Sequence, residues 1–97
     1  MKIVKEKNGN ELYISLEGRL DSTSSPDLEK EIQSLDGITS LIFDFKDLEY
    51  ISSAGLRLIL HSQKIMNKQG RMVVKNVRES VKDIFKITGF YDNLTFE

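Results

Sequence analysis

Apolar and polar residues alternate strictly over residues 12–16, with the two-residue period of a strand that buries one face. The Asn8-Gly9 pair before them is a strong signal for a tight hairpin. It predicts that a first short strand, beginning at residues 3–4, pairs with the second one. Gly18 is expected to end the second strand.

The next apolar pattern is helical. Ser25 before Pro26 is typical of a helix N-cap followed by proline at the first helical position. Acidic residues in the first turn suit the positive end of the helix dipole. Apolar residues at positions i, i+4 and i+7 follow on one face and end at Leu35, and Asp36-Gly37 is expected to stop the helix.

The same spacing predicts two further helices. One begins at residues 52–53, carries an apolar stripe and stops before Gly70. The other is expected to take Asn76 as its cap and to end at Gly89. Its inner face consists of Val77, Val81, Ile84 and Phe85.

The remaining apolar runs are short and predict strands. LIFDF (residues 41–45) is apolar except for one carboxylate, which is typical of a central strand covered on both sides. Residues 46–50 are expected to connect this strand to the following helix. Residues 72–74 form another run, and residues 94–96 are a candidate for a last strand.

These elements occur in the order β-β-α-β-α-β-α-β. Helices that alternate with strands imply right-handed crossovers and a largely parallel sheet. The expected fold class is therefore α/β: a single domain, residues 1–97, whose central mixed, mostly parallel sheet starts with the hairpin and has helices packed against it. In such sheets the loops after the strand carboxyl ends form the functional edge. The loops at residues 18–25 and 49–55 are expected to share that edge.

Composition narrows the classes of function. The 14 basic and 15 acidic residues give a net charge of −1, without the clustered basic surface typical of nucleic-acid binding. The absence of cysteine removes disulfides, thiolate catalysis and the common zinc sites. No apolar run reaches the roughly 18 residues of a membrane span, and the first residues lack a signal-peptide core. We therefore expect a soluble, cytoplasmic domain with no cofactor, no metal and no membrane insertion.

The sequence YISSAGLRLIL (residues 50–60) places two hydroxyls and two small residues before an apolar helix. A serine hydrolase needs a base beside its nucleophile. The single histidine, His61, lies eight residues after Ser53, about 12 Å along a helix. The G-x-S-x-G pattern of a nucleophile elbow is missing as well. Asp44 and Asp47 are only an isolated carboxylate pair, so neither an enzyme nor a metal site is expected.

The residues alone leave two interpretations of Ser52 and Ser53 open. A serine at a helix N-cap bonds an otherwise free backbone N–H, which contributes about 1 kcal/mol and explains one serine. The second interpretation is a modified serine. Small Ala54 and Gly55 leave the backbone open to close approach, and a helix N-terminus favours an added phosphate. Capping is the simpler interpretation of the two.

Three segments together resemble the anti-sigma factor antagonist family, whose fold is the STAS domain. EGRLDSTSSPDLEKEI (residues 17–32) resembles the loop that leads into the family's first helix. LIFDFKDLEYISSAGLRLIL (residues 41–60) resembles its central strand, loop and phosphoacceptor helix. GRMVVKNVRESVKDIFKITGFYDNLTF (residues 70–96) resembles its later strand, helix and closing segment. The resemblance covers nearly the whole chain.

The resemblance implies a partner switch without enzymatic activity. In this family the unphosphorylated antagonist binds an anti-sigma factor that is also a serine kinase. Phosphorylation of the antagonist dissociates the complex, and a serine phosphatase removes the phosphate again. The family pattern Asp-Ser-(Ser, Thr or Ala)-Gly is here Ser52-Ser53-Ala54-Gly55. Ser53 therefore takes the phosphoacceptor position, and Ser52, which replaces the aspartate, is a competing acceptor.

The resemblance also implies a partner face made from both loops, in which Asp21 matches an acidic residue of the family. The residues expected there are Asp21, Ser22, Thr23, Ser52, Ser53, Ala54 and Gly55. STAS domains also serve in sensory and lipid-transport assemblies. In such a module Ser53 would be only a cap, and the same face would dock without phosphorylation. Beside the kinase and the phosphatase, a homodimer is left open.

Overall fold

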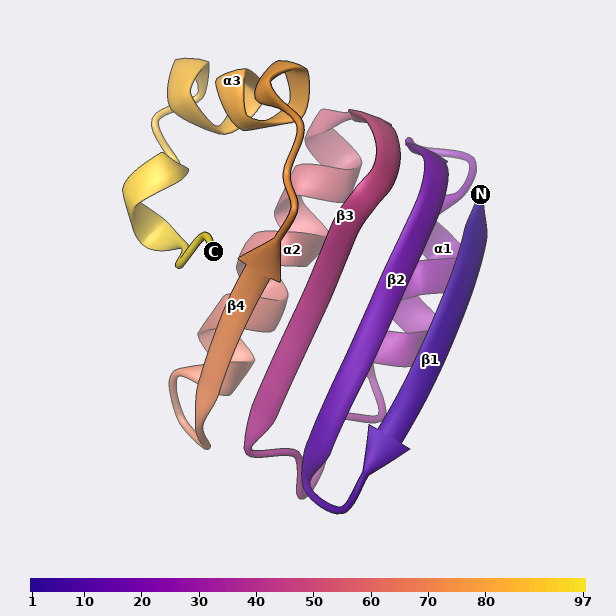
Figure 1. Cartoon of the computed structure of the whole chain (residues 1–97), viewed down its shortest axis with the longest axis vertical. Helices are drawn as coiled ribbons and strands as arrows, with labels where there is room; N and C mark the ends of the chain where they lie inside the picture. Colours follow the sequence, from indigo (N-terminus) through magenta and orange to yellow (C-terminus); the bar gives the residue numbers. More distant parts are fainter.

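The computed structural model describes residues 1–97 and contains four strands, three α-helices and one 3-10 turn (Figure 1). In chain order they are β1 Lys2–Asn8, β2 Glu11–Leu20, α1 Ser25–Ile32, β3 Ser40–Ile51, α2 Ser53–Met66, β4 Arg71–Lys75, α3 Glu79–Ile87 and the turn η1 Tyr91–Asn93. This order confirms the predicted one as far as α3. The candidate last strand is reduced to a single parallel bridge between Phe96 and Val74 of β4.

The sheet has the strand order β1-β2-β3-β4. The β1 and β2 strands are antiparallel, whereas β2, β3 and β4 run parallel to one another. Gly9 in the hairpin has a φ of 61°, a left-handed conformation that glycine adopts without steric cost. The predicted mixed, mostly parallel sheet with an N-terminal hairpin is therefore confirmed.

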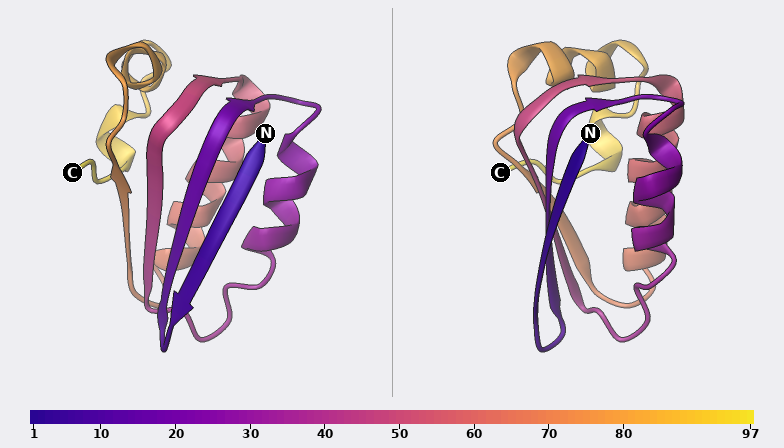
Figure 2. Two further views of the ribbon diagram at one scale, coloured as in Figure 1. Left: turned by 45° about the vertical axis from the view of Figure 1, so that its right-hand side comes forward. Right: turned by 90° about the vertical axis from the view of Figure 1, so that its right-hand side faces the viewer.

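Helices α1 and α2 lie side by side on one face of the sheet, and α3 lies across one end (Figure 2). The core fills the space between this face and the two helices. Its largest fully buried side chains include Phe43, Phe45, Ile14 and Ile59. An ion pair of 2.5 Å between Lys5 and Glu31 also joins the edge strand β1 to α1.

The other face of the sheet has no helix over it, so the prediction of a strand covered on both sides is wrong. Leu41, Phe43 and Phe45 are fully buried, but Ile42 and Asp44 between them are only half-buried. Both crossover helices pack on the same side of the sheet, so alternate side chains of β3 point away from the core. The continuous apolar run therefore spans two faces with different environments.

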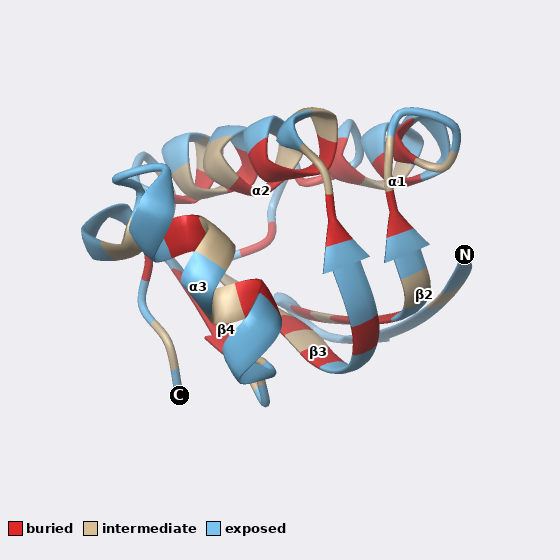
Figure 3. Cartoon of the chain, turned by 90° about the horizontal axis from the view of Figure 1, so that it is seen from above, coloured by how far each residue is buried: buried red, intermediate tan, exposed pale blue.

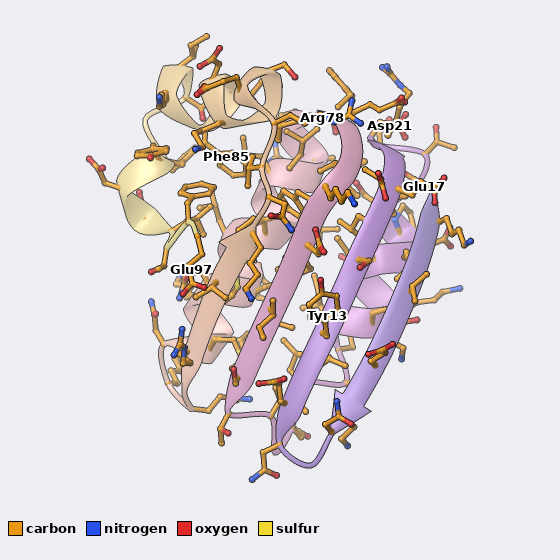
Figure 4. All side chains as sticks on the ribbon, in the orientation of Figure 1. Tyr13, Glu17, Asp21, Arg78, Phe85 and Glu97 are labelled. Carbon is orange, nitrogen blue, oxygen red and sulfur yellow. The ribbon has the colours of Figure 1, made fainter.

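Tyr13 lies on this open face (Figure 4) and forms a polar contact with Asp44 of the neighbouring strand β3. The Tyr13 hydroxyl donates to one carboxylate oxygen of Asp44. The other oxygen accepts from Asn76 at 3.1 Å and from the Lys46 amide at 3.0 Å. Burial pushes the pKa of Asp44 up, but these hydrogen bonds outweigh it and hold that pKa below its ordinary value. The same contact raises the pKa of Tyr13.

The ends of β2 and β3 bend towards the helices and close one end of the core (Figure 3). Residues 46–50 were expected to be a connector, yet β3 continues through them to Ile51. Gly18 likewise does not end its strand. It lies at a register shift between β2 and β3 with a φ of 102°. The bends turn the buried side chains of Leu20 and Ile51 towards the core, so both strands end beside a helix start.

The boundaries of α1 differ from those expected. The helix begins at Ser25 with Ser24 as the N-cap, one residue earlier than predicted, because Ser25 already bonds back to Asp21. It ends at Ile32, and Leu35 is buried in the turn that follows.

The cap predicted for α3 is wrong. Asn76 has a left-handed φ of 58°, and its amide group donates to Asp44 instead. The helix begins at Glu79 with Arg78 as the N-cap residue. Val81 and Phe85 are buried as expected, while Val77 and Ile84 pack at the margin of the core.

None of the three α-helices combines the length and the hydrophobicity that a membrane-spanning helix requires.

Candidate functional site

Asp21 organises the loop between β2 and α1. One carboxylate oxygen accepts the amides of Thr23 at 3.0 Å and Ser24 at 3.1 Å. The Asp21 carbonyl accepts the Ser25 amide at 2.8 Å and the Ser25 hydroxyl at 2.5 Å. The hydrogen bond from the Ser24 backbone holds the pKa of Asp21 below its ordinary value, against a smaller opposing effect of burial. These bonds make Asp21 the residue that shapes the loop.

The Ser24 side chain completes this turn. Its hydroxyl donates to the Arg19 carbonyl at 2.7 Å and accepts the Asp21 amide at 3.0 Å. Ser22 and Thr23, at the tip of the loop, are exposed. Their side chains form no hydrogen bond within the chain, so both hydroxyls are available to another molecule.

Ser52 is the N-cap of α2. Its backbone is extended, with φ −90° and ψ 174°, and its hydroxyl accepts the Gly55 amide at 3.3 Å. Its carbonyl accepts the Leu56 amide at 2.8 Å, the first hydrogen bond of the helix. The capping interpretation therefore describes Ser52, and it leaves Ser53 without a structural task of this kind.

Ser53 is the first residue of α2 and is exposed. Its side chain forms no hydrogen bond within the chain. No acidic residue lies in the first turn of α2, whereas α1 has Asp27 and α3 has Glu79 in that position. A free hydroxyl thus stands at the positive end of a 14-residue helix.

Gly55 brings the two predicted loops into contact. A Cβ at this position would lie 2.6 Å from Leu20 Cγ and 2.9 Å from the Leu20 carbonyl oxygen at the end of β2. The same Leu20 carbonyl accepts the Ser52 amide at 2.8 Å. Gly55 itself is buried. Its part in the site is to allow the first turn of α2 to approach β2, which a side chain would prevent.

All seven residues expected at the partner face lie at this one end of the molecule, where β2 and β3 reach the starts of α1 and α2 (Figure 3). Asp21 lies at the end of β2 (Figure 4). A groove between the two helix starts joins the loops, and its lining includes Ser22 and Ala54. The structure therefore brings the predicted residues together, although Gly55 is buried and one Asp21 oxygen is already engaged.

Sequence reasoning missed two residues of this region. Arg57 lines the same groove from α2, and Glu29 lines it from α1. The spacing of four between Ser53 and Arg57 places them on one helix face, and this signal could have found Arg57. Arg19 also stacks on Tyr50, with its guanidinium carbon 4.3 Å from the ring centre, and connects the ends of β2 and β3.

His61 is exposed on α2, two turns beyond Ser53, and no group of three potential metal ligands occurs in the chain.

The STAS domain family model matches residues 2–97. The chain belongs to the STAS domain family. This confirms the resemblance that the three sequence segments indicated.

Two relatives of this STAS domain carry the name anti-sigma factor antagonist. BtrV of Bordetella bronchiseptica is 34% identical over 93 residues, which cover 93% of this chain and 80% of BtrV. The anti-sigma-B factor antagonist of Bacillus subtilis is 30% identical over 89 residues, which cover 90% of this chain and 82% of that protein.

Solved structures show the same fold. The unphosphorylated form of the anti-sigma factor antagonist SpoIIAA matches with a TM-score of 0.85 at 21% identity, covering 99% of this chain and 88% of that one. The phosphorylated form of SpoIIAA from Bacillus matches with a TM-score of 0.78 at 20% identity, covering 99% and 91%. At these identities the likeness concerns the fold of this STAS domain.

Proposed function

We propose that this STAS domain is an anti-sigma factor antagonist that works as a phosphorylation-controlled partner switch. The unphosphorylated form binds an anti-sigma factor that is also a serine kinase. Phosphorylation of Ser53 releases that partner, and a serine phosphatase restores the binding form. The domain itself catalyses no reaction in this scheme.

The observation that carries the proposal is that two adjacent serines have different roles at the start of α2. Ser52 caps α2, and Ser53 presents a free, exposed hydroxyl beside the loop of Ser22 and Thr23. The names of the two relatives support the antagonist role. The existence of SpoIIAA in a phosphorylated form supports modification as the control.

The proposed modification is an ordinary phosphoryl transfer. The kinase supplies ATP, the Ser53 oxygen forms a bond to the γ-phosphorus, and the bond between the β- and γ-phosphates breaks. The hydroxyl proton leaves to a base of the kinase. Hydrolysis by the phosphatase replaces the phosphate on Ser53 with a proton and regenerates the free hydroxyl.

The charge of the phosphate explains why binding would be lost while the fold is kept. A phosphoserine adds about −1.5 to −2 charges at neutral pH. Within the domain the helix N-terminus stabilises such a charge by about 0.3–1 kcal/mol. Across a docked face, a partner carboxylate about 4 Å away repels each charge by about 4 kcal/mol at an effective dielectric constant of 20. Even a screened penalty of about 3 kcal/mol weakens affinity roughly a hundredfold.

The test begins with a pull-down from an extract of the native cells, which recovers the kinase that binds this STAS domain. Phosphate incorporation is measured for the wild type, Ser53→Ala and Ser52→Ala, and the modified residue is located by mass spectrometry. We expect Ser53→Ala to abolish most incorporation and Ser52→Ala to retain it. Phosphate found only on Ser52 would disprove the residue assignment and leave the switch standing.

The mechanism is tested by titration calorimetry and thermal melting of the phosphorylated and unmodified proteins. We expect roughly a hundredfold weaker binding to the kinase and a nearly unchanged melting temperature. Equal affinities of the two forms would instead favour the alternative function, a STAS module that docks in a sensory or lipid-transport assembly without phosphorylation.

A further inference from the structure

Arg57 lies one helical turn after Ser53 on α2 and is exposed. It forms no hydrogen bond or ion pair through its side chain. Residues four apart on a helix have Cβ atoms about 5–6 Å from each other. Helical side chains also lean towards the helix N-terminus, so Arg57 covers the turn that contains Ser53.

Two grooves flank Arg57, and it lines both. One, between the starts of α1 and α2, also contains Glu29 and Ala54. The other lies between α2 and the segment after α3, and it contains His61 and Phe90. No other residue lines both grooves. Arg57 therefore lies between two open spaces, and its exposed side chain has room to change direction.

We propose that Arg57 is the intramolecular partner of a phosphate on Ser53. A guanidinium presents paired N–H donors that match two phosphate oxygens, and such pairs are stronger than bonds between neutral groups. In this role Arg57 is a positioning residue that orients the phosphate and compensates part of its charge. The inference rests on the proposed function only in that Ser53 is the residue that carries the phosphate.

Other charged groups near this pair come from three elements. Glu29 of α1 lines the groove that Arg57 shares, and Asp21 belongs to the loop beside it. The Asp21 carboxylate is already engaged by its own loop. His61 is on the far side of Arg57, about 12 Å along the helix from Ser53. A phosphate carries up to two charges where Glu29 carries one, so the phosphate is the stronger partner for Arg57.

This pairing gives phosphorylation a second effect on the partner face. The modification adds a negative charge at Ser53 and at the same time engages the free cation of Arg57. A partner carboxylate that Arg57 attracts in the unmodified protein loses that attraction when the phosphate is present. Release of the partner therefore draws on the negative charge that remains after this pairing and on the loss of Arg57 as a donor to the partner.

The test measures the second pKa of the phosphate by phosphorus NMR over a pH titration at 0.1 M salt. Phosphoserine is installed at position 53 during translation, so no kinase is needed. The proteins compared are the wild type, Arg57→Gln and, as a control, Lys64→Gln. The Lys64→Gln substitution removes the same charge from the same helix. Lys64 lies about 16 Å along the axis from Ser53, beyond the screening length of about 10 Å at 0.1 M salt.

We expect this pKa, ordinarily about 6, to be higher by about 0.2–0.4 in Arg57→Gln than in the wild type. In Lys64→Gln it should change by less than about 0.1, and 1 M salt should remove most of the Arg57 effect. Arg57→Lys keeps the charge without the paired donors and should give a smaller increase than Arg57→Gln.

Equal values in the wild type and Arg57→Gln would overturn the inference, as would an equal increase in Lys64→Gln. If Arg57→Gln alters the melting temperature, the phosphate pKa of Arg57→Lys is compared with that of the wild type instead. A kinase that fails to modify Ser53 would contradict the proposed function without affecting this result, because the phosphate is placed independently of the kinase.

Discussion

The loop around Asp21 and the first turn of α2 are neighbours with opposite characters. In the loop, the carboxylate, the carbonyl and the hydroxyls of Ser24 and Ser25 all bond to one another or to nearby backbone. In the turn, one serine caps the helix and the next is left free. Both regions place a serine at a helix start, but the Ser25 hydroxyl is buried and bonded, whereas the Ser53 hydroxyl is exposed and free.

This difference teaches that hydroxyl content alone does not mark a reactive site. The loop uses its polar groups to fix its own shape and so positions its exposed tip. The turn is shaped by Ser52 and by the contact of Gly55 with Leu20, which leaves Ser53 free for chemistry. The polar groups of the loop therefore have a structural role, whereas the turn presents a free hydroxyl.

The contact between the two regions gives the largest expected effect on stability. Gly55→Ala places a Cβ within 3 Å of the Leu20 side chain and carbonyl, so the end of β2 must shift. We expect a loss of about 1–3 kcal/mol in the free energy of unfolding, measured by urea denaturation. Arg57→Ala, in the same helix and exposed, serves as the control. Full stability of Gly55→Ala would show that the two regions are not closely packed.

Loss of the cap comes next. Ser52→Ala removes the acceptor of the Gly55 amide and should cost about 1 kcal/mol in the same denaturation experiment. Ser52→Asp keeps an acceptor at the N-cap and should retain most of the stability. An unaffected Ser52→Ala protein would remove the distinction between the two serines on which the comparison depends.

Acid should weaken the loop that Asp21 shapes. The pKa of Asp21 is lower in the folded protein than its ordinary value, so the folded state binds this proton less readily than the unfolded chain. Its contribution to stability is therefore present above the unfolded pKa of about 4 and is lost as the pH falls through the folded pKa. We expect Asp21→Asn to flatten the decline in melting temperature below about pH 4. Asp27→Asn, on α1, is the control, and an identical decline in both variants would contradict this role for Asp21.

Ser53→Ala should have the smallest effect on stability. The side chain is exposed and forms no bond, and alanine is a good helix former, so the change should stay within about 0.5 kcal/mol. Measured beside Ser52→Ala, it shows directly whether the two adjacent serines differ. Equal losses in both variants would mean that they share the capping role.

The regular parts of this fold could be predicted because single patterns determine them. Alternation over residues 12–16 and the Asn8-Gly9 turn set the hairpin, and helical spacing set α2. The length of β3 could not be predicted in the same way. Its second half bends, so Leu48 and Ile51 are buried three residues apart, and the charged residues among them look like a connector.

Long-range contacts account for the other differences. Asn76 has the side chain of a good cap, but its bond to Asp44 on β3 favours a left-handed turn instead. The sequence placed both candidate loops at one edge correctly. It could not decide between Ser52 and Ser53 as the cap, because that depends on the backbone angles at the end of β3.

The ion pair between Lys5 and Glu31 has a consequence for self-association. The outer edge of β1 offers unpaired backbone groups to which a strand from a second copy could add. Lys5 points to the helix side of the sheet, in register with buried Ile14, and a strand added there would crowd its charge and that of Glu31. Lys5 therefore disfavours the addition of a second strand to the open edge of β1. Replacement of Lys5 by valine should promote concentration-dependent aggregation, which sedimentation of the two proteins would reveal.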